Sequence, residues 1–216
     1  PMALCLGSES LLFFLLSLIS KHINDISLSA YQASIHAASI IYMISIGIGN
    51  AAGIITARHY ITKNIQAISK TFLLSIGLGL LVLAPILVSF YFFSERIALI
   101  YTSDTATRIL IENNIIISIP FLVFEFIFVV ARLTLRSMND FWIPTIMTIL
   151  TLNIFGVLSS ATLLLLYEHN VRSIFLALAL CSFTLMLLLL WRLRCTLKYA
   201  SKTLCIEENL HRIKQR

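Results

Sequence analysis

Two glutamates, Glu9 and Glu125, each lie inside a long and almost uninterrupted run of apolar residues. A carboxylate in the middle of a membrane helix costs roughly 2.5–3.5 kcal/mol on insertion scales, judged from aspartate, so such residues usually serve an ion or substrate path. Two carboxylates that meet can hold a monovalent cation together with hydroxyl and amide oxygens, or share a proton because like charges disfavour double ionisation. Glu9 and Glu125 are therefore the candidate residues of an ion or substrate path, and such a pair could hold Na⁺ or a shared proton.

Motifs for enzyme chemistry are missing from the sequence. It contains no Ser/His/Asp spacing and no H-E-x-x-H pattern. The four cysteines, Cys5, Cys181, Cys195 and Cys205, lack the C-x-x-C spacing of metal and redox sites, which indicates reduced thiols. We therefore expect no catalytic residues, no enzyme activity, and no cofactor beyond a small cation such as Na⁺ or H⁺.

Composition indicates a membrane protein. Apolar residues make up 59% of the 216 residues and charged residues 12%, and mean hydropathy is +0.94; soluble domains have about 45–50% apolar and about 25% charged residues. No segment alternates with the period of a barrel strand. Six stretches reach the roughly 20 apolar residues that a membrane helix needs: 2–20, 27–55, 71–93, 115–135, 141–166 and 173–191. The predicted fold is all-α, a polytopic membrane protein with a six-transmembrane-helix bundle.

The connections between spans are expected to be short and polar, as at 21–25 and 168–170. The exception is 94–114, where mixed apolar and charged residues are typical of a short helix lying in the membrane interface. We divide the chain into a six-helix transmembrane lobe at 1–192 and a basic cytoplasmic tail at 193–216. Because an open reading frame does not begin with proline, Pro1 predicts a fragment.

The distribution of basic residues predicts the orientation, because cytoplasmic loops collect Lys and Arg. If the first span runs outward from the cytoplasm, twelve of the 16 Lys and Arg residues fall on the inner side and four on the outer side. Both ends are then cytoplasmic, in a multi-pass protein of the bacterial inner membrane. The basic inner side explains the net charge of +6, so the lipid bilayer is an expected partner and nucleic acid is not.

This orientation places the two glutamates at one depth. At 1.5 Å per residue, Glu9 and Glu125 both lie roughly 12–15 Å from the inner surface, near the middle of a ~30 Å hydrocarbon core. Arg132 follows Glu125 by seven residues and returns to the same helical face. It either neutralises that acid or extends its side chain towards the inner interface, and the sequence leaves both roles open.

The first, second and fourth predicted spans carry polar and aromatic residues at spacings that can be compared with those of known membrane proteins. Pro1 opens the first span, Glu9 stands eight residues later, and Phe13 follows. The second span contains Leu28-Ser29-Ala30-Tyr31-Gln32 and then Asn50-Ala51-Ala52. In the fourth span, an acid precedes a Leu-Arg turn by ten residues.

That acid is Glu125, and the turn reads Leu135-Arg136-Ser137-Met138-Asn139-Asp140. From Pro1 to about Trp191, the chain thus resembles the C-terminal half, helices seven to twelve, of the multidrug and toxic compound extrusion transporters. It departs from the family pattern where glycine is expected, at Ser137 in the turn and at Ala57 and Ile61 near the end of the second span. Such positions favour close backbone approach or a positive φ, in which β-branched Ile fits poorly.

The resemblance implies one lobe of a twelve-helix transporter, whose two lobes rock about a central cleft and export drugs or organic cations while Na⁺ or H⁺ enters. It implies that Glu9 and Glu125 couple the ion, and that Gln32 and Asn50 line the cavity. Phe121 and Phe128 are further candidates for stacking on a substrate. The implied partners are the missing N-terminal lobe of the same transporter and a small organic cation or drug.

Two other functions remain open from the sequence. A lipid-linked saccharide flippase of the same wider superfamily would share the rocking bundle, although it would favour basic residues in the central cavity. A non-transporting membrane scaffold or an intramembrane enzyme belongs to a different class. The enzyme would require a nucleophile, a base and a metal or oxyanion group at one depth, and the sequence shows no such set.

Overall fold

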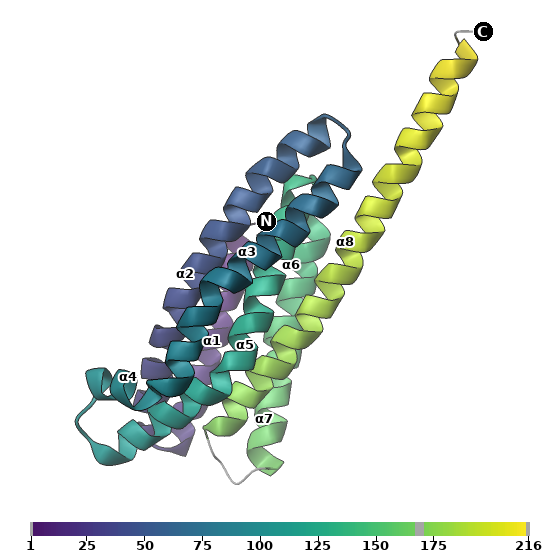
Figure 1. Cartoon of the computed structure of the whole chain (residues 1–216). Coiled ribbons are helices and arrows are strands. Elements are labelled where there is room, and N and C mark those ends of the chain that lie inside the picture. The colour runs from purple at the N-terminus through teal and green to yellow at the C-terminus, as the bar shows by residue number, and fades with distance from the viewer. Residues whose placement is uncertain (1, 167–170, 215–216) are drawn as a thin grey trace.

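The computed structural model describes the backbone of residues 2–166 and 171–214 (Figure 1). Within these ranges every regular element is a helix, in the order α1 (Met2–Ile23), α2 (Asp25–Ile61), α3 (Ile65–Phe92), α4 (Ser94–Tyr101), α5 (Thr105–Ser137), α6 (Trp142–Ile149), η1 (Leu150–Gly156), α7 (Val157–Leu166) and α8 (Arg172–Lys214). α6, η1 and α7 follow one another without a break and form one span. Six spans are long and apolar enough to cross a membrane, which confirms the predicted all-α bundle.

Several helices extend past the apolar runs, because polar residues at the span ends continue the helix. The predicted connection at 21–25 is reduced to Asn24, whose Oδ1 accepts a hydrogen bond from the Ser27 N–H at 2.6 Å and caps α2. The predicted connection at 168–170 lies outside the described residues. The proposed boundary between lobe and tail, at 192/193, falls inside α8, so the division remains a prediction.

A short helix precedes the fourth span, as the mixed composition of 94–114 predicted. It is α4, which ends at Tyr101, and α5 begins only four residues later, so the second half of 94–114 belongs to the span itself. Asp104 caps α5 by accepting hydrogen bonds from the N–H and the hydroxyl of Thr107, at 2.9 and 2.6 Å. These bonds lower the pKa of Asp104 below its ordinary value, which keeps the cap ionised.

The centre of the bundle is α5, which packs against α2, α3 and α8. Leu122, Phe126 and Val129 on this helix are fully buried. α3 approaches α5 closely at Gly79, where a Cβ atom would lie 2.0 Å from Cζ of Phe126, so a larger side chain at Gly79 would clash with the ring. The close packing of α5 holds its polar residues away from lipid.

The fifth span contains a π-helical segment, η1, between α6 and α7. Its Thr151 carbonyl accepts a hydrogen bond from Cys181 Sγ on α8, at 3.1 Å. Asn153 in the same segment donates from Nδ2 to the hydroxyl of Ser8, next to Glu9 in the sequence. Irregular segments of this kind often occur at functional sites, and η1 fixes the part of α1 that carries Glu9.

The departures from the family glycines cause no backbone strain. Ile61 lies within α2 and Ser137 within α5, both in helical conformation. The non-glycine residues with positive φ are Lys63, at 57°, and Asn139, at 64°. The expectation of a strained Ile61 was therefore wrong, because the chain turns two residues later, at Lys63.

Candidate functional site

Glu9 lies on α1 with only 7% of its surface exposed, and its carboxylate is fully engaged by other helices. The hydroxyl of Tyr42 on α2 donates to Glu9 Oε2 at 2.6 Å. The other oxygen, Oε1, forms an ion pair and hydrogen bond with Nη1 of Arg132 on α5. Charge-assisted hydrogen bonds are roughly twice as strong as neutral ones. Glu9 thus connects α1, α2 and α5.

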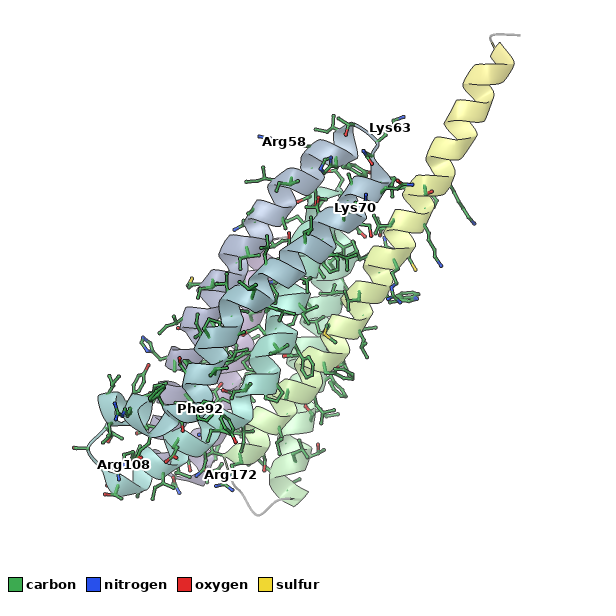
Figure 2. All side chains as sticks on the ribbon, viewed as in Figure 1. Arg58, Lys63, Lys70, Phe92, Arg108 and Arg172 are labelled. Atoms are coloured by element: carbon green, nitrogen blue, oxygen red, sulfur yellow. The ribbon has the colours of Figure 1, made fainter. Side chains whose placement is uncertain are left out.

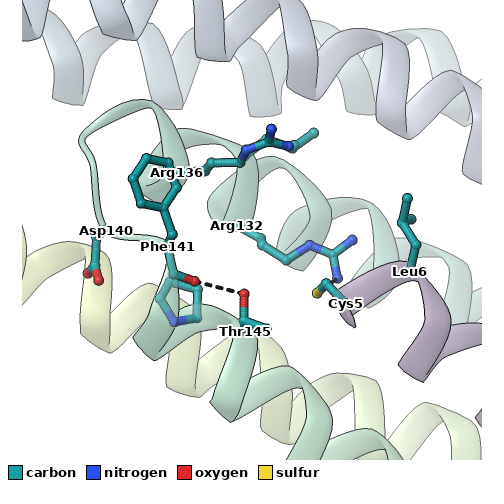
Figure 3. Close-up of a pocket in the computed structure, with 9 residues that line it drawn as sticks. Cys5, Leu6, Arg132, Arg136, Asp140, Phe141 and Thr145 are labelled. Atoms are coloured by element: carbon teal, nitrogen blue, oxygen red, sulfur yellow. Dashed lines mark hydrogen bonds between the residues drawn. The ribbon is translucent and has the colours of Figure 1, made fainter. Parts of the chain in front are cut away.

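Arg132 points into the bundle and does not extend towards the inner interface. Besides Glu9, its Nη1 contacts Cys5 Sγ on α1 at 3.1 Å, and its guanidinium carbon lies 5.7 Å from the centre of the Phe128 ring. Figure 3 shows this side chain directed at Cys5, apart from Arg136 one turn further along α5. Of the two predicted roles, Arg132 therefore neutralises an acid, but its ion-pair partner is Glu9 on another helix and not Glu125.

Glu125 lines the same pocket as Glu9 and is also buried, with 6% of its surface exposed. The pocket has a volume of about 230 Å³, and its apolar wall includes Phe13 and Phe121. Among the described residues, no side chain donates a hydrogen bond to Glu125, so the two acids differ in their surroundings. The sequence placed both carboxylates at one depth, and in the structure they share one pocket.

The other predicted residues are distributed over several places. Phe121 is in the wall of the glutamate pocket, and Phe128 lies beneath the guanidinium of Arg132. Asn50 lines a separate pocket with Arg136, and Gln32 is exposed on α2. The structure thus brings Phe121 into the pocket of the two acids and Phe128 to the arginine that pairs with Glu9. The functional roles of all four residues stay predictions.

Tyr42 is the residue of this site that sequence reasoning missed. It lies 33 positions after Glu9, so only the packing of α1 on α2 brings the two together. The sequence did contain a signal, because membrane tyrosines concentrate in belts at the two interfaces and Tyr42 lies in the middle of a predicted span. A mid-span tyrosine needs a partner for its hydroxyl, and a mid-span acid is a natural one.

A second cavity of about 230 Å³ is lined by Arg132 and lies between α1, α5 and α6 (Figure 3). Its polar residues include Arg132, Arg136, Asp140 and Thr145. Asp140 accepts hydrogen bonds from Arg192 Nε at 2.7 Å and from the Thr196 hydroxyl at 3.3 Å, which ties the turn after α5 to α8. Arg132 therefore lines this second cavity while its guanidinium pairs with Glu9, which lines the glutamate pocket.

The described residues hold no group of three or more His, Cys, Asp and Glu side chains that would suit a metal ion with several protein ligands. The glutamate pocket offers two carboxylates together with the hydroxyls of Tyr42, Ser10 and Ser39. Oxygen atoms of this kind suit a monovalent cation or a proton. The pocket can therefore bind and release a monovalent cation or a proton in apolar surroundings.

Comparison with known proteins bears on the fold and the family. The curated "Probable multidrug resistance protein NorM" of Bacillus cereus is 26% identical over 157 residues, which are 73% of this chain and 35% of that protein. Two solved structures have the same fold. One is described as the outward-facing conformation of a multidrug resistance MATE family transporter of the MOP superfamily, with a TM-score of 0.86, 12% identity, and coverage of 92% of this chain and 45% of that one.

The other is described as the inward-facing conformation of such a transporter, with a TM-score of 0.81, 14% identity, and coverage of 93% and 46%. The chain therefore spans less than half the length of these proteins. The MatE family model matches residues 1–162, which include Glu9, Tyr42, Glu125 and Arg132. On this match the chain belongs to the MatE family of membrane transporters.

Proposed function

We propose that this chain forms one lobe of an antiporter that exports drugs or organic cations by alternating access, coupled to entry of Na⁺ or H⁺. The observation that carries the proposal is the pocket in which buried carboxylates from α1 and α5 meet beside aromatic rings. Burying two acids in a membrane bundle is costly. A site that exchanges one cation for another gives both acids a use.

Alternating access requires a second lobe that moves against this one. The fold of this chain is similar to the corresponding half of both an outward-facing and an inward-facing solved transporter, with TM-scores of 0.86 and 0.81. This supports a lobe that keeps its internal fold while its position changes. The second lobe is expected to close the glutamate pocket from the side that this chain leaves open.

The charges around the pocket favour a cationic substrate over an anionic lipid-linked saccharide. Its titratable lining residues are Glu9, Tyr42 and Glu125, and the nearby Arg132 is paired with Glu9. The formal charge of these groups is −1 when both acids are ionised. An anionic headgroup would be repelled, whereas an organic cation would be attracted.

We further propose that both chain ends face the cytoplasm. Arg58, Lys63 and Lys70 gather at the end of the bundle from which α8 projects, and Arg108 and Arg172 lie at the opposite end (Figure 2). Single cysteines introduced at Asn24 are expected to react with an impermeant maleimide from outside, and cysteines at Asn64 or Ser201 only after permeabilisation. Labelling in the reverse pattern would overturn the orientation.

Gradient-driven dye export is the test of the proposed function. In a protein that carries both six-helix lobes, reconstituted in vesicles, an imposed Na⁺ or pH gradient is expected to drive ethidium movement against its own gradient. The two gradients are applied separately, so the experiment also identifies the coupling ion. Vesicles without a gradient are the control, and export that neither gradient stimulates would rule the proposal out.

A further inference from the structure

The glutamate site already holds an organic cation, which is the guanidinium of Arg132. Its charge is paired with Glu9, its central carbon lies over the Phe128 ring at 5.7 Å from the ring centre, and Tyr42 donates to the remaining oxygen of the same carboxylate. A cation held by a carboxylate and an aromatic face is the arrangement by which proteins recognise organic cations. Arg132 therefore occupies Glu9 in the way that a bound organic cation could.

The charge of Arg132 cannot be removed by pH in the physiological range, because a guanidinium does not deprotonate in proteins. Glu9 is therefore neutralised without any Na⁺ or proton while the pair is intact. Glu125 lies in the same pocket and has no such partner among the described side chains. The two acids consequently face different competitors, a tethered cation at Glu9 and only mobile ions at Glu125.

Space for an alternative position of Arg132 exists next to the pair. The side chain also lines the second cavity of about 230 Å³, whose lining includes Thr145 and Asp140, the latter already bonded to Arg192 and Thr196 (Figure 3). Cys5 and Leu6 form the α1 side of this cavity. A guanidinium displaced from Glu9 can thus move into a hollow that has polar partners, without leaving the bundle.

We propose that Arg132 is a tethered cation that competes with the exported cation for Glu9, while Glu125 takes the coupling ion. The inference rests on the proposed export function of this pocket and deepens it. Displacement of one guanidinium frees one carboxylate, so the preferred substrate carries a single positive charge. Its apolar body would lie against Phe13, Ile35 and Phe121 in the pocket wall.

Binding of tetraphenylphosphonium, a lipophilic monocation, tests the competition without transport. The purified chain Pro1–Arg216 in detergent is dialysed to equilibrium with the radiolabelled probe. Arg132→Met replaces the methylene stem of arginine by an unbranched apolar side chain and removes the tethered charge. The variant is therefore expected to bind the probe about tenfold more tightly. Arg136→Met removes a positive charge one turn further along α5 and is expected to change affinity by less than about twofold.

Two additional measurements assign the effect to Glu9. In the double variant Glu9→Gln/Arg132→Met, the gain in affinity is expected to disappear. Free guanidinium chloride at millimolar concentration is expected to displace the probe from Arg132→Met, with sodium chloride at equal ionic strength as the control. Unchanged or weaker probe binding by folded Arg132→Met, judged by circular dichroism and thermal unfolding, would overturn the proposal.

If Arg132→Met does not fold, the Arg132→Lys variant tests the competition for Glu9 instead. Lysine keeps the charge but lacks the planar fork that engages Glu9 and Phe128 together, so probe affinity is expected to rise about threefold, and an unchanged or lower affinity contradicts the competition. Failure of the proposed function is seen separately. Both measurements are made in a two-lobe protein. If Arg132→Met binds the probe more tightly but the unsubstituted protein shows no gradient-driven export, the export function is refuted and the competition stands. If the unsubstituted protein exports but Arg132→Met does not bind more tightly, the competition is refuted and export stands.

Discussion

Replacing Glu9 or Glu125 by glutamine is expected to reduce ion-driven dye export at least tenfold in a protein that carries both six-helix lobes. Glutamine has nearly the volume of glutamate, so each substitution removes a negative charge with little change in side-chain volume. Each change leaves a single carboxylate among the residues that line the pocket, where exchange of a coupling ion for a cationic substrate needs both. Efflux is followed by the fluorescence of ethidium in cells that lack their own pumps. Glu112→Gln, on α5 but outside the pocket, is the matched control.

The two substitutions are expected to differ in their effect on folding. Glu9→Gln leaves the guanidinium of Arg132 buried without its counter-charge, and breaking a buried ion pair from one side costs about 3–5 kcal/mol. Glu125→Gln removes no hydrogen bond to a described side chain, so its expression and thermal stability should stay close to those of the unsubstituted protein. The double variant Glu9→Gln/Arg132→Met removes both charges and should restore stability without restoring export. Normal export by Glu125→Gln, or by the double variant, would show that the respective acid is structural.

Hydropathy and charge were sufficient to predict the architecture, because the bilayer imposes a length and a composition on each span. The six spans and the short helix before the fourth span follow from counting residues along apolar runs, whereas the meeting of Glu9 and Glu125 in one pocket also needed the packing of α1 near α5, which the count does not give. The ends of the helices could not be predicted in this way. Capping hydrogen bonds at Asn24 and Asp104 set where α2 and α5 begin, and hydrophobicity does not. The break of the fifth span by η1 left no signal that we recognised.

The partner of Arg132 illustrates why the interior of the site was harder to predict. Helical periodicity relates Arg132 to Glu125, seven residues away on the same helix, and so it named that acid as the partner. The ion pair instead joins residues 123 positions apart, and it depends on the rotation of α1 against α5. Periodicity within one helix cannot supply that rotation. Tyr42 was missed for the same reason, since its bond to Glu9 depends on how α2 packs against α1.

Expression of Pro1–Arg216 alone is expected to leave pump-deficient cells as sensitive to cationic dyes as the empty-vector control. The chain should nevertheless insert and fold, because its six spans satisfy their own backbone hydrogen bonds and their apolar lengths suit a bilayer. Export is different, because the cleft of an alternating-access transporter lies between two lobes. The chain spans 45% and 46% of the two solved transporters that it matches, which leaves the length of a second lobe unaccounted for.

Self-association is the remaining route by which the chain could work without another lobe. An inverted copy would have to place the basic residues of the inner side, Arg58, Lys63 and Lys70 among them, on the outer side of the membrane, which the charge asymmetry opposes. A parallel copy would present the same face twice, with two glutamate pockets opposed, and would place four buried acids near one another. The measurement is the minimum inhibitory concentration of ethidium, with surface expression confirmed by a C-terminal tag. Resistance above the empty vector that disappears in Glu125→Gln would show that the lone lobe transports, and that two copies of this pocket are enough to form the cleft.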